Sequence, residues 1–320
     1  MTRTTTHTDH PAAAASPGEL STGRACCGPS CCAEPAEAEP HEAPGAEGLV
    51  AAVRERYEAI AEGRLPSCCG LAAGDGEAGG AALALGYSAE DLAALPDGAN
   101  LDLGCGAPLQ FLALQPGETV LDLGSGAGID ALLAARRVGT GGRVIGVDMT
   151  PAMLARARDN AAAAGFGNVE FRAGRLEALP VGNDEVDAVT SNCVINLVPD
   201  KAAVFAEIAR VLLPGGRLVI SDIVLDAPLP AALENDLLAY VGCVAGALQR
   251  ETYFAMVRAA GLGDLEVLRD VDYLAALAAV GENLPAELRE LAELAGVAAA
   301  DLAGAVRSVT FRARRPLAAS

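Results

Sequence analysis

The chain has 320 residues, of which 52% are hydrophobic and only 3% aromatic, so it is long enough for one large domain or two modest ones. The formal net charge of −19 argues against a nucleic-acid-binding surface, which needs clustered Lys and Arg. No apolar run reaches the roughly 20 residues that cross a bilayer, and the N-terminus lacks the apolar stretch of a secretory signal. We therefore expect a soluble cytoplasmic protein without a nucleic-acid or membrane partner.

Composition and apolar periodicity divide the chain into four parts. In order, these are a tail at 1–47, a helical and loop segment at 48–116, a nucleotide-binding core at 117–225 and a C-terminal extension at 226–320. The tail is rich in Cys, Ala, Pro and Glu without apolar periodicity, so we expect it to be flexible and disordered. The second part predicts a helix at 49–62 and a short helix that begins after Ser88.

Apolar runs alternate with helical patterns from residue 117 onward. Strands are predicted at 119–123, 143–147, 168–172, 185–191 and 217–223, with helices between them at 128–138, 151–163 and 200–211. Beyond residue 226, helix is expected over 231–260 and 286–304, and strands at 265–269 and 307–313. This alternation predicts an α/β fold in which right-handed crossovers join a mostly parallel seven-stranded sheet with helices on both faces.

A glycine-rich turn follows the first predicted strand. Asp122 precedes Gly124, Gly126 and Gly128 at the head of the next predicted helix, where the backbone can approach a bound nucleotide closely. Asp148 ends the second predicted strand, a position from which an acidic side chain accepts hydrogen bonds from ribose hydroxyls. Taken alone, this turn also fits a nicotinamide-dependent dehydrogenase.

The segment 101–106 superficially copies the glycine turn. Pro108 follows almost at once, so no crossover helix has room to form after it, and a nucleotide loop needs strand, turn and helix together. We therefore interpret 101–106 as an irregular segment that presents Cys105.

Nine cysteines stand in a chain whose three histidines all lie before residue 42. In a reducing compartment, such cysteines serve metal binding or catalysis more often than disulfides. Cys193 follows the fourth predicted strand, so we expect its thiol at the carboxyl end of the sheet, facing the nucleotide turn. The lack of histidine in the predicted folded part disfavours a mechanism that needs an imidazole base.

Several motifs become informative when they are taken together. They are CCG (68–70), LGCG (103–106), GVDMT (146–150), SNCVINLVPDK (191–201), LPGG (213–216) and GCVAGAL (242–248). With the glycine turn, this set resembles the S-adenosylmethionine methyltransferases and, over roughly residues 49–315, the arsenite methyltransferases. The resemblance implies a Rossmann-like methyltransferase core with a C-terminal extension, and stepwise methylation of trivalent arsenic in arsenic detoxification.

The resemblance also implies roles for individual residues. It implies S-adenosylmethionine as cofactor, with contacts from Asp122, Gly124, Ser125, Gly126, Asp148, Met149, Leu176, Glu177 and Asn192. Cys193 and Cys243 correspond to arsenic-binding thiols, and Cys105 to a third catalytic cysteine that shares the arsenic. Cys68 or Cys69 corresponds to a disulfide-relay cysteine, and the choice between the two stays open.

The chemistry of trivalent arsenic agrees with these roles. Soft thiol ligands suit this soft centre and leave its lone pair free to attack a sulfonium methyl group, so no general base is required. Methylation formally oxidises arsenic, and a disulfide between Cys105 and Cys68 or Cys69, reset by thioredoxin or glutathione, is expected to return the electrons. The expected substrates are arsenite and methylated trivalent arsenicals.

Three other interpretations remain open beside this one. They are a small-molecule C- or O-methyltransferase with structural cysteines, a non-catalytic metalloid-binding thiol protein, and the dehydrogenase. The tail cysteines at 26, 27, 31 and 32 lie outside the resemblance. They could capture arsenite, bind another thiophilic metal, or have no role in the reaction.

Overall fold

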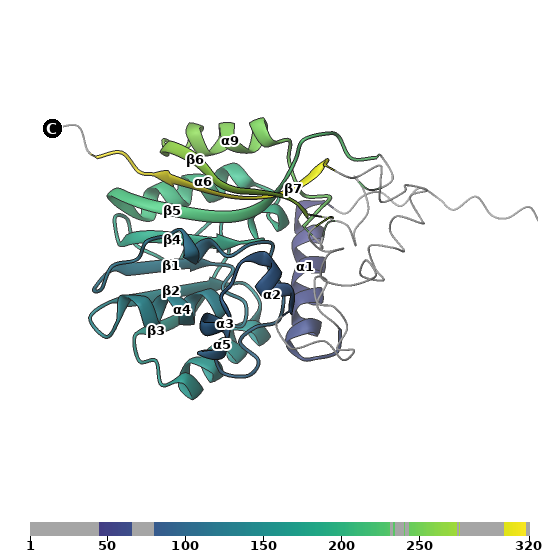
Figure 1. Ribbon diagram of the computed structural model, residues 1–320. Coiled ribbons are helices and arrows are strands. Elements are labelled where there is room, and N and C mark those ends of the chain that lie inside the picture. The colour runs from purple at the N-terminus through teal and green to yellow at the C-terminus, as the bar shows by residue number, and fades with distance from the viewer. Residues whose placement is uncertain are drawn as a thin grey trace, which may run out of the picture. The chain divides into compact units, whose positions relative to one another are not determined.

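A seven-stranded sheet organises the chain, in the order β3-β2-β1-β4-β5-β7-β6 (Figure 1). The strands are β1 Thr119–Leu123, β2 Arg143–Asp148, β3 Val169–Ala173, β4 Val186–Asn192, β5 Leu212–Leu225, β6 Gly263–Asp272 and β7 Val306–Arg314. β1 to β5 pair in parallel, whereas β7 runs antiparallel to both of its neighbours, β5 and β6. The mostly parallel seven-stranded α/β sheet predicted from the sequence is confirmed.

The computed structural model describes residues 45–65, 80–230, 243–273 and 304–317, together with 233, 240 and 275. All of these residues belong to one unit, Ala43–Ser320. The predicted tail up to residue 44, the cysteines at 68 and 69, and residues 286–303 of a predicted helix lie outside the described residues. Within the described ranges, no helix has the length and apolar character needed to cross a membrane.

Helices flank the sheet on both faces. They are α1 Ala46–Ala61, α2 Gly80–Leu85, α3 Ala89–Ala93, α4 Ile129–Val138, α5 Pro151–Ala164, α6 Lys201–Val211 and α9 Arg250–Ala259, with 3-10 turns at Pro108–Gln110 and Ile195–Leu197. Local capping explains several starts and ends. The Ser88 hydroxyl accepts a hydrogen bond from the Asp91 backbone N–H at 3.0 Å, and Gly165 ends α5 with a φ of 71°.

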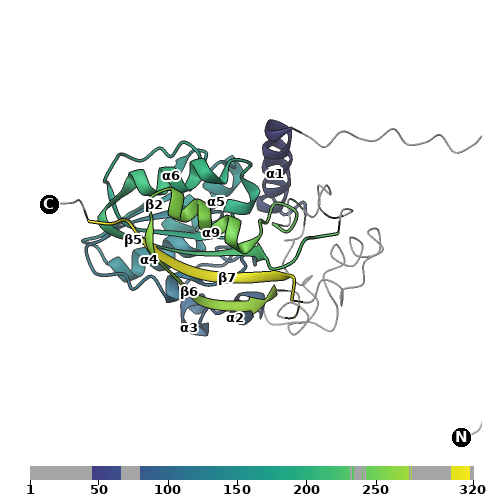
Figure 2. The same cartoon turned by 90° about the horizontal axis from the view of Figure 1, so that it is seen from above.

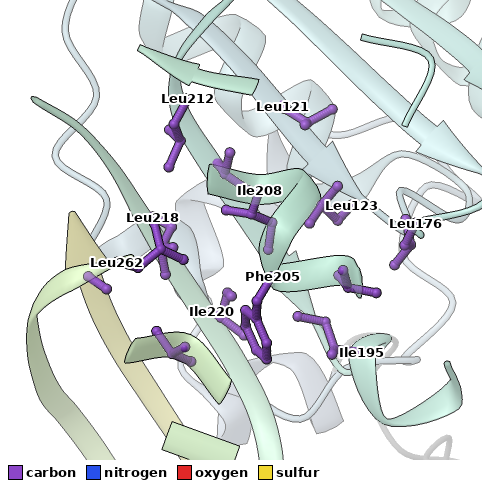
Figure 3. Close-up of a cluster of buried hydrophobic side chains, with 14 of the residues drawn as sticks. Leu121, Leu123, Leu176, Ile195, Phe205, Ile208, Leu212, Leu218, Ile220 and Leu262 are labelled. Carbon is purple, nitrogen blue, oxygen red and sulfur yellow. The ribbon is translucent and has the colours of Figure 1, made fainter. Parts of the chain in front are cut away.

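Alternate residues of β1 enter two different hydrophobic clusters, as strand geometry requires. Leu121 and Leu123 pack with Phe205 and other residues of α6 and α9 on one face (Figure 3), while Val120 packs with α4 and α5 on the other. α6 and α9 lie side by side (Figure 2). Asp122 alternates with Leu121 and Leu123, so its carboxylate points to the face that α4 covers.

The helical prediction over 231–260 is confirmed at residues 250–259, which form α9, and is wrong at residues 243–249. Residues 243–249 form turns and an isolated bridge between Gln249 and Leu225, and regular helix begins only at Arg250. Cys243 has a φ of 66°, in the left-handed region that a right-handed helix cannot contain. The break places Cys243 in a turn instead of on a helix face.

Two further expectations concern the loops that flank the core. The segment 101–106 is irregular, as predicted, and contains neither helix nor strand. β5 begins at Leu212 instead of residue 217, because Leu212 pairs with Val186 of β4 ahead of a register shift. The LPGG segment therefore lies inside the strand.

Candidate active site

A pocket opens at the carboxyl ends of β1, β2 and β4, where an open α/β sheet binds its ligands. Its empty space, together with the open solvent at its mouth, is about 1190 Å³. All nine residues expected to contact the cofactor line it: Asp122, Gly124, Ser125, Gly126, Asp148, Met149, Leu176, Glu177 and Asn192. Cys193 lines the same pocket, so one of the predicted thiols faces the space where a cofactor would lie.

The glycine turn at the head of α4 shapes one wall of this pocket. Gly124 and Gly126 have φ angles of 64° and 49°, a region that other residues rarely adopt. A Cβ atom on Gly124 would lie 2.5 Å from Val194, whereas one on Gly126 would meet nothing within 4 Å. The Gly126 N–H donates a hydrogen bond of 3.0 Å to Asp148, which ties the turn to the end of β2.

Three carboxyl groups lie at the pocket: Asp122 and Asp130 are buried, and Asp148 is half-buried. Burial raises the pKa of all three groups, and their mutual repulsion raises the pKa of Asp122 further. Each Asp148 oxygen accepts one backbone hydrogen bond, from Gly126 and from Thr150. One Asp122 oxygen has no hydrogen-bond partner among the described residues. The pocket is therefore built to receive a ligand with hydrogen-bond donors or positive charge.

A buried hydrogen-bond network joins the pocket to Cys105. The Tyr87 hydroxyl donates to both Asp130 oxygens at 2.9 and 3.0 Å, and accepts from the Asn192 amide at 2.9 Å. The same amide also donates to the Gly106 carbonyl at 2.8 Å, while its oxygen accepts the Cys105 backbone N–H at 3.1 Å. Sequence reasoning missed two members of this network, Tyr87 and Asp130. The only signal for Asp130 is its place in the first helical turn after the glycine turn.

The structure brings Cys105, Cys193 and Cys243 into one buried cluster from three distant segments. None of the three forms a disulfide with another described cysteine, and their exposed fractions are 1%, 6% and 3%, respectively. Cys193 has a φ of 58°, and the backbone N–H of this residue donates to Ser221 at 2.9 Å. The Cys243 thiol donates to the Cys193 carbonyl at 2.9 Å. The left-handed backbone at Cys193 and Cys243 turns the chain within the thiol cluster.

The electrostatic surroundings keep the Cys193 thiol protonated. A hydrogen bond with Cys105 and burial raise the pKa of Cys193 well above its usual value, against a lowering contribution from Cys243. At neutral pH, Cys193 is therefore a neutral thiol. Cys68 and Cys69 lie outside the described residues.

Comparison with known proteins identifies the family of this chain. Residues 114–261 match the family described as a methyltransferase domain. The arsenite methyltransferase of Halobacterium salinarum is 50% identical over 226 residues, covering 67% of this chain and 57% of that protein. An arsenic(III) S-adenosylmethionine methyltransferase structure from Chlamydomonas reinhardtii matches at 33% identity and a TM-score of 0.53, covering 74% of this chain and 73% of that one. This chain belongs to the arsenite methyltransferase family.

Other arsenite methyltransferases match a shorter part of the chain. The Homo sapiens arsenite methyltransferase is 40% identical over 130 residues, covering 38% of this chain and 35% of that protein. The chain spans about half the length of the curated relatives that it matches, with 57% and 47% covered in the first two. Residues 114–261, which match the methyltransferase domain, include the strands β1, β2 and β4 whose carboxyl ends form the pocket.

The S-adenosylmethionine implied by the arsenite methyltransferase family fits the residues of the pocket. The partnerless Asp122 oxygen and the raised pKa of its carboxyl group suit a cationic ligand, which would restore the ionised form. The open space at Gly126 admits a ligand close to the backbone. The apolar side chains of Met149 and Leu176 offer contact for a flat ring.

Proposed function

We propose that this arsenite methyltransferase family member transfers the methyl group of S-adenosylmethionine to trivalent arsenic held by Cys105, Cys193 and Cys243. One observation carries the proposal: three buried thiols from distant segments meet in one cluster, and one of them, Cys193, lines a pocket that suits a cationic nucleoside. The substrates are arsenite and its methylated trivalent products.

Substrate capture by the three thiols conserves charge. Neutral arsenite carries three hydroxyl groups, and exchange with three protonated thiols releases three water molecules and no net proton. The raised pKa of Cys193 is therefore no obstacle to binding, because no isolated thiolate is left in the buried cluster. Three sulfur ligands suit the soft arsenic centre and leave its lone pair unshared.

Methyl transfer then depends on the position of the arsenic. When bound, S-adenosylmethionine supplies a methyl group on a sulfonium sulfur, and the carbon–sulfur bond breaks as the arsenic lone pair forms the carbon–arsenic bond. Cys193 holds the arsenic at the pocket wall, and burial of the three thiols excludes water. No side chain has to remove a proton, which agrees with the absence of histidine beyond residue 41.

The redox part of the cycle needs two electrons for each methyl group. Arsenic gives up its lone pair to carbon and becomes formally pentavalent, and two thiols that join as a disulfide return two electrons to it. We assign this disulfide to Cys105 with Cys68 or Cys69. A reduced thiol partner such as thioredoxin or glutathione then takes the oxidising equivalents by exchange.

The test is turnover by single Cys→Ser variants at 68, 69, 105, 193 and 243, incubated with arsenite, S-adenosylmethionine and a thiol reductant. We expect Cys193→Ser and Cys243→Ser to lose at least about a hundredfold in rate, equivalent to about 2.7 kcal/mol. Val244→Ala is the matched control, since it removes packing from the same cluster and keeps every thiol.

Two outcomes would overturn the proposal. Near-normal methyl transfer to another acceptor by both Ser variants would identify a C- or O-methyltransferase with structural cysteines. Arsenite binding without measurable S-adenosylmethionine affinity in calorimetry would identify a metalloid-binding thiol protein.

A further inference from the structure

A buried carboxylate shares the thiol cluster. Ligand atoms of Cys105, Cys193 and Asp222 all lie within 4.8 Å of one another, and all three residues are buried. Asp222 lies on β5 and has no exposed surface. The methyl transfer described above gives this carboxylate no role, since the arsenic ligands are sulfur atoms.

The Asp222 carboxylate is held in a fixed orientation. Its oxygens accept hydrogen bonds of 2.9 Å from the Tyr253 hydroxyl, the Asn196 amide and the Ile223 backbone N–H. Donors on both oxygens fix the plane of the carboxylate, which is the group that a cation would share with them. Such outer hydrogen bonds are the arrangement that orients a metal-binding carboxylate.

We propose that Cys105, Cys193 and Asp222 form a binding site for a thiophilic divalent cation of the Zn²⁺ type. Zn²⁺ binds cysteine sulfur and carboxylate oxygen together, at about 2.3 and 2.0–2.2 Å, and three protein ligands leave a fourth position for water. Ligand atoms around such an ion lie roughly 3.5 Å apart, so the three atoms need to move by about 1 Å at most.

The charges near the site support a divalent ion. Two thiolates and one carboxylate carry three negative charges, which a divalent ion reduces to one. Lys201 is buried beside this group, donates to the carbonyls of Asn196 and Val198 at 3.2 and 3.0 Å, and attracts Asp222 electrostatically. The positive charge of the Lys201 ammonium balances the one negative charge that remains. The protons of the two thiols are released to solvent. The net charge of −19 adds a general attraction for cations.

The cation site and the arsenic site differ in one ligand each. Arsenic takes Cys243 as its third ligand, an assignment that rests on the proposed function, whereas the divalent ion takes Asp222. Cys105 and Cys193 are common to both sites, so the two occupants exclude each other. Divalent thiophilic ions should therefore compete with arsenite for the protein.

The test is a Cd²⁺ titration of the full chain with Ser at 26, 27, 31, 32, 68 and 69, so that only the three clustered thiols remain. Sulfur-to-cadmium charge-transfer absorbance reports binding, and cadmium NMR reports the number of sulfur ligands. We expect two sulfurs, a loss of affinity of more than about tenfold in Asp222→Asn, and retention of affinity in Cys243→Ser. Arsenite should displace the ion from the unsubstituted site and should still bind Asp222→Asn.

Each result decides the proposal. Three sulfur ligands, or loss of Cd²⁺ binding in Cys243→Ser, would overturn it, because the third ligand would then be sulfur. Unchanged Cd²⁺ affinity in a folded Asp222→Asn variant, checked by its thermal transition, would overturn it as well. Failure of arsenite to bind, with Cd²⁺ bound through two sulfurs, would instead contradict the proposed function and leave the cation site standing.

Discussion

Tyr87→Phe isolates the contribution of one hydroxyl group to the electrostatics of the pocket. This hydroxyl donates to both oxygens of Asp130 and is itself buried. Burial raises the pKa of Asp130 to about 6, and the hydrogen bond from Tyr87 holds it down. Because Asp130 lines the pocket, its charge state should influence any ligand that carries a positive sulfonium.

The size of the effect follows from the strength of a hydrogen bond to a charged group, about 1.5–3 kcal/mol. At 1.36 kcal/mol per pKa unit, its loss raises the pKa of Asp130 by about 1–2 units, from about 6 to about 7–8. At pH 7 the ionised fraction then falls from about nine-tenths to between about one-half and one-tenth. The affinity for a sulfonium ligand, relative to the same ligand without the positive charge, should fall about two- to tenfold as this ionised fraction falls.

The assay compares the affinities of S-adenosylmethionine and S-adenosylhomocysteine by calorimetry, since the second lacks the sulfonium charge. We expect the affinity ratio to fall in Tyr87→Phe at pH 7 and to recover at pH 9, where Asp130 is ionised in both proteins. Tyr240→Phe is the control, because that hydroxyl donates at 3.1 Å to the neutral carbonyl of Leu197. An unchanged ratio at pH 7 would refute the inference that the charge of Asp130 acts on a sulfonium ligand in the pocket.

Two further predictions concern backbone strain and proton linkage. Gly124→Ala and Gly126→Ala both place a Cβ atom at positive φ, but only the first clashes with Val194, so it should lose at least about 1 kcal/mol more in urea denaturation. Equal losses would contradict the clash. Burial raises the pKa of Asp222 from 3.8 to about 7, so the folded state binds its proton more tightly, and the stability that this group contributes is fully present below pH 3.8 and is lost as the pH rises through 7. Over roughly 3 units this contribution falls by about 4 kcal/mol, so the decrease in unfolding free energy from pH 4 to pH 8 should be smaller by about that amount in Asp222→Asn, and an equal decrease in both proteins would contradict it.

The core of the fold could be predicted because its signals are local. Runs of apolar residues and the glycine turn depend on neighbours in sequence, and the strands from 119 to 192 lie within a residue or two of their predicted bounds. Within the helical prediction over 231–260, residues 243–249 form turns because tertiary contacts overrule their helical spacing, whereas residues 250–259 are helical as predicted. Gly246 packs so closely on the Asn196 carbonyl that a Cβ atom would lie 2.2 Å from that oxygen, and Cys243 is left-handed.

The candidate site divides in the same way. Short sequence motifs predicted the residues of the glycine turn and the cysteines at 105, 193 and 243. The structure places the glycine turn at one pocket and the three cysteines in one cluster. Tyr87 and Asp130 could not be paired from sequence, since 43 positions separate them and neither lies in a motif that signals the other. Asp222 was missed for a similar reason: within a buried strand, a lone carboxyl group has no sequence pattern that marks its partners.

Asn192 and Cys193 connect the two halves of the site through adjacent positions at the end of β4. In extended strand, consecutive side chains point to opposite faces, which would send one of the two away from the pocket. The left-handed backbone of Cys193, with a φ of 58°, breaks that alternation, and both residues line the pocket. The Asn192 amide then faces Tyr87 and Asp130 while its oxygen holds the Cys105 backbone. A shift of this single amide therefore alters the polar wall of the pocket and the thiol cluster together. If the proposed function holds, S-adenosylmethionine should change the arsenite affinity of the unsubstituted protein and not that of Asn192→Ala, and calorimetry with and without the cofactor checks this; the same change in both proteins would contradict it.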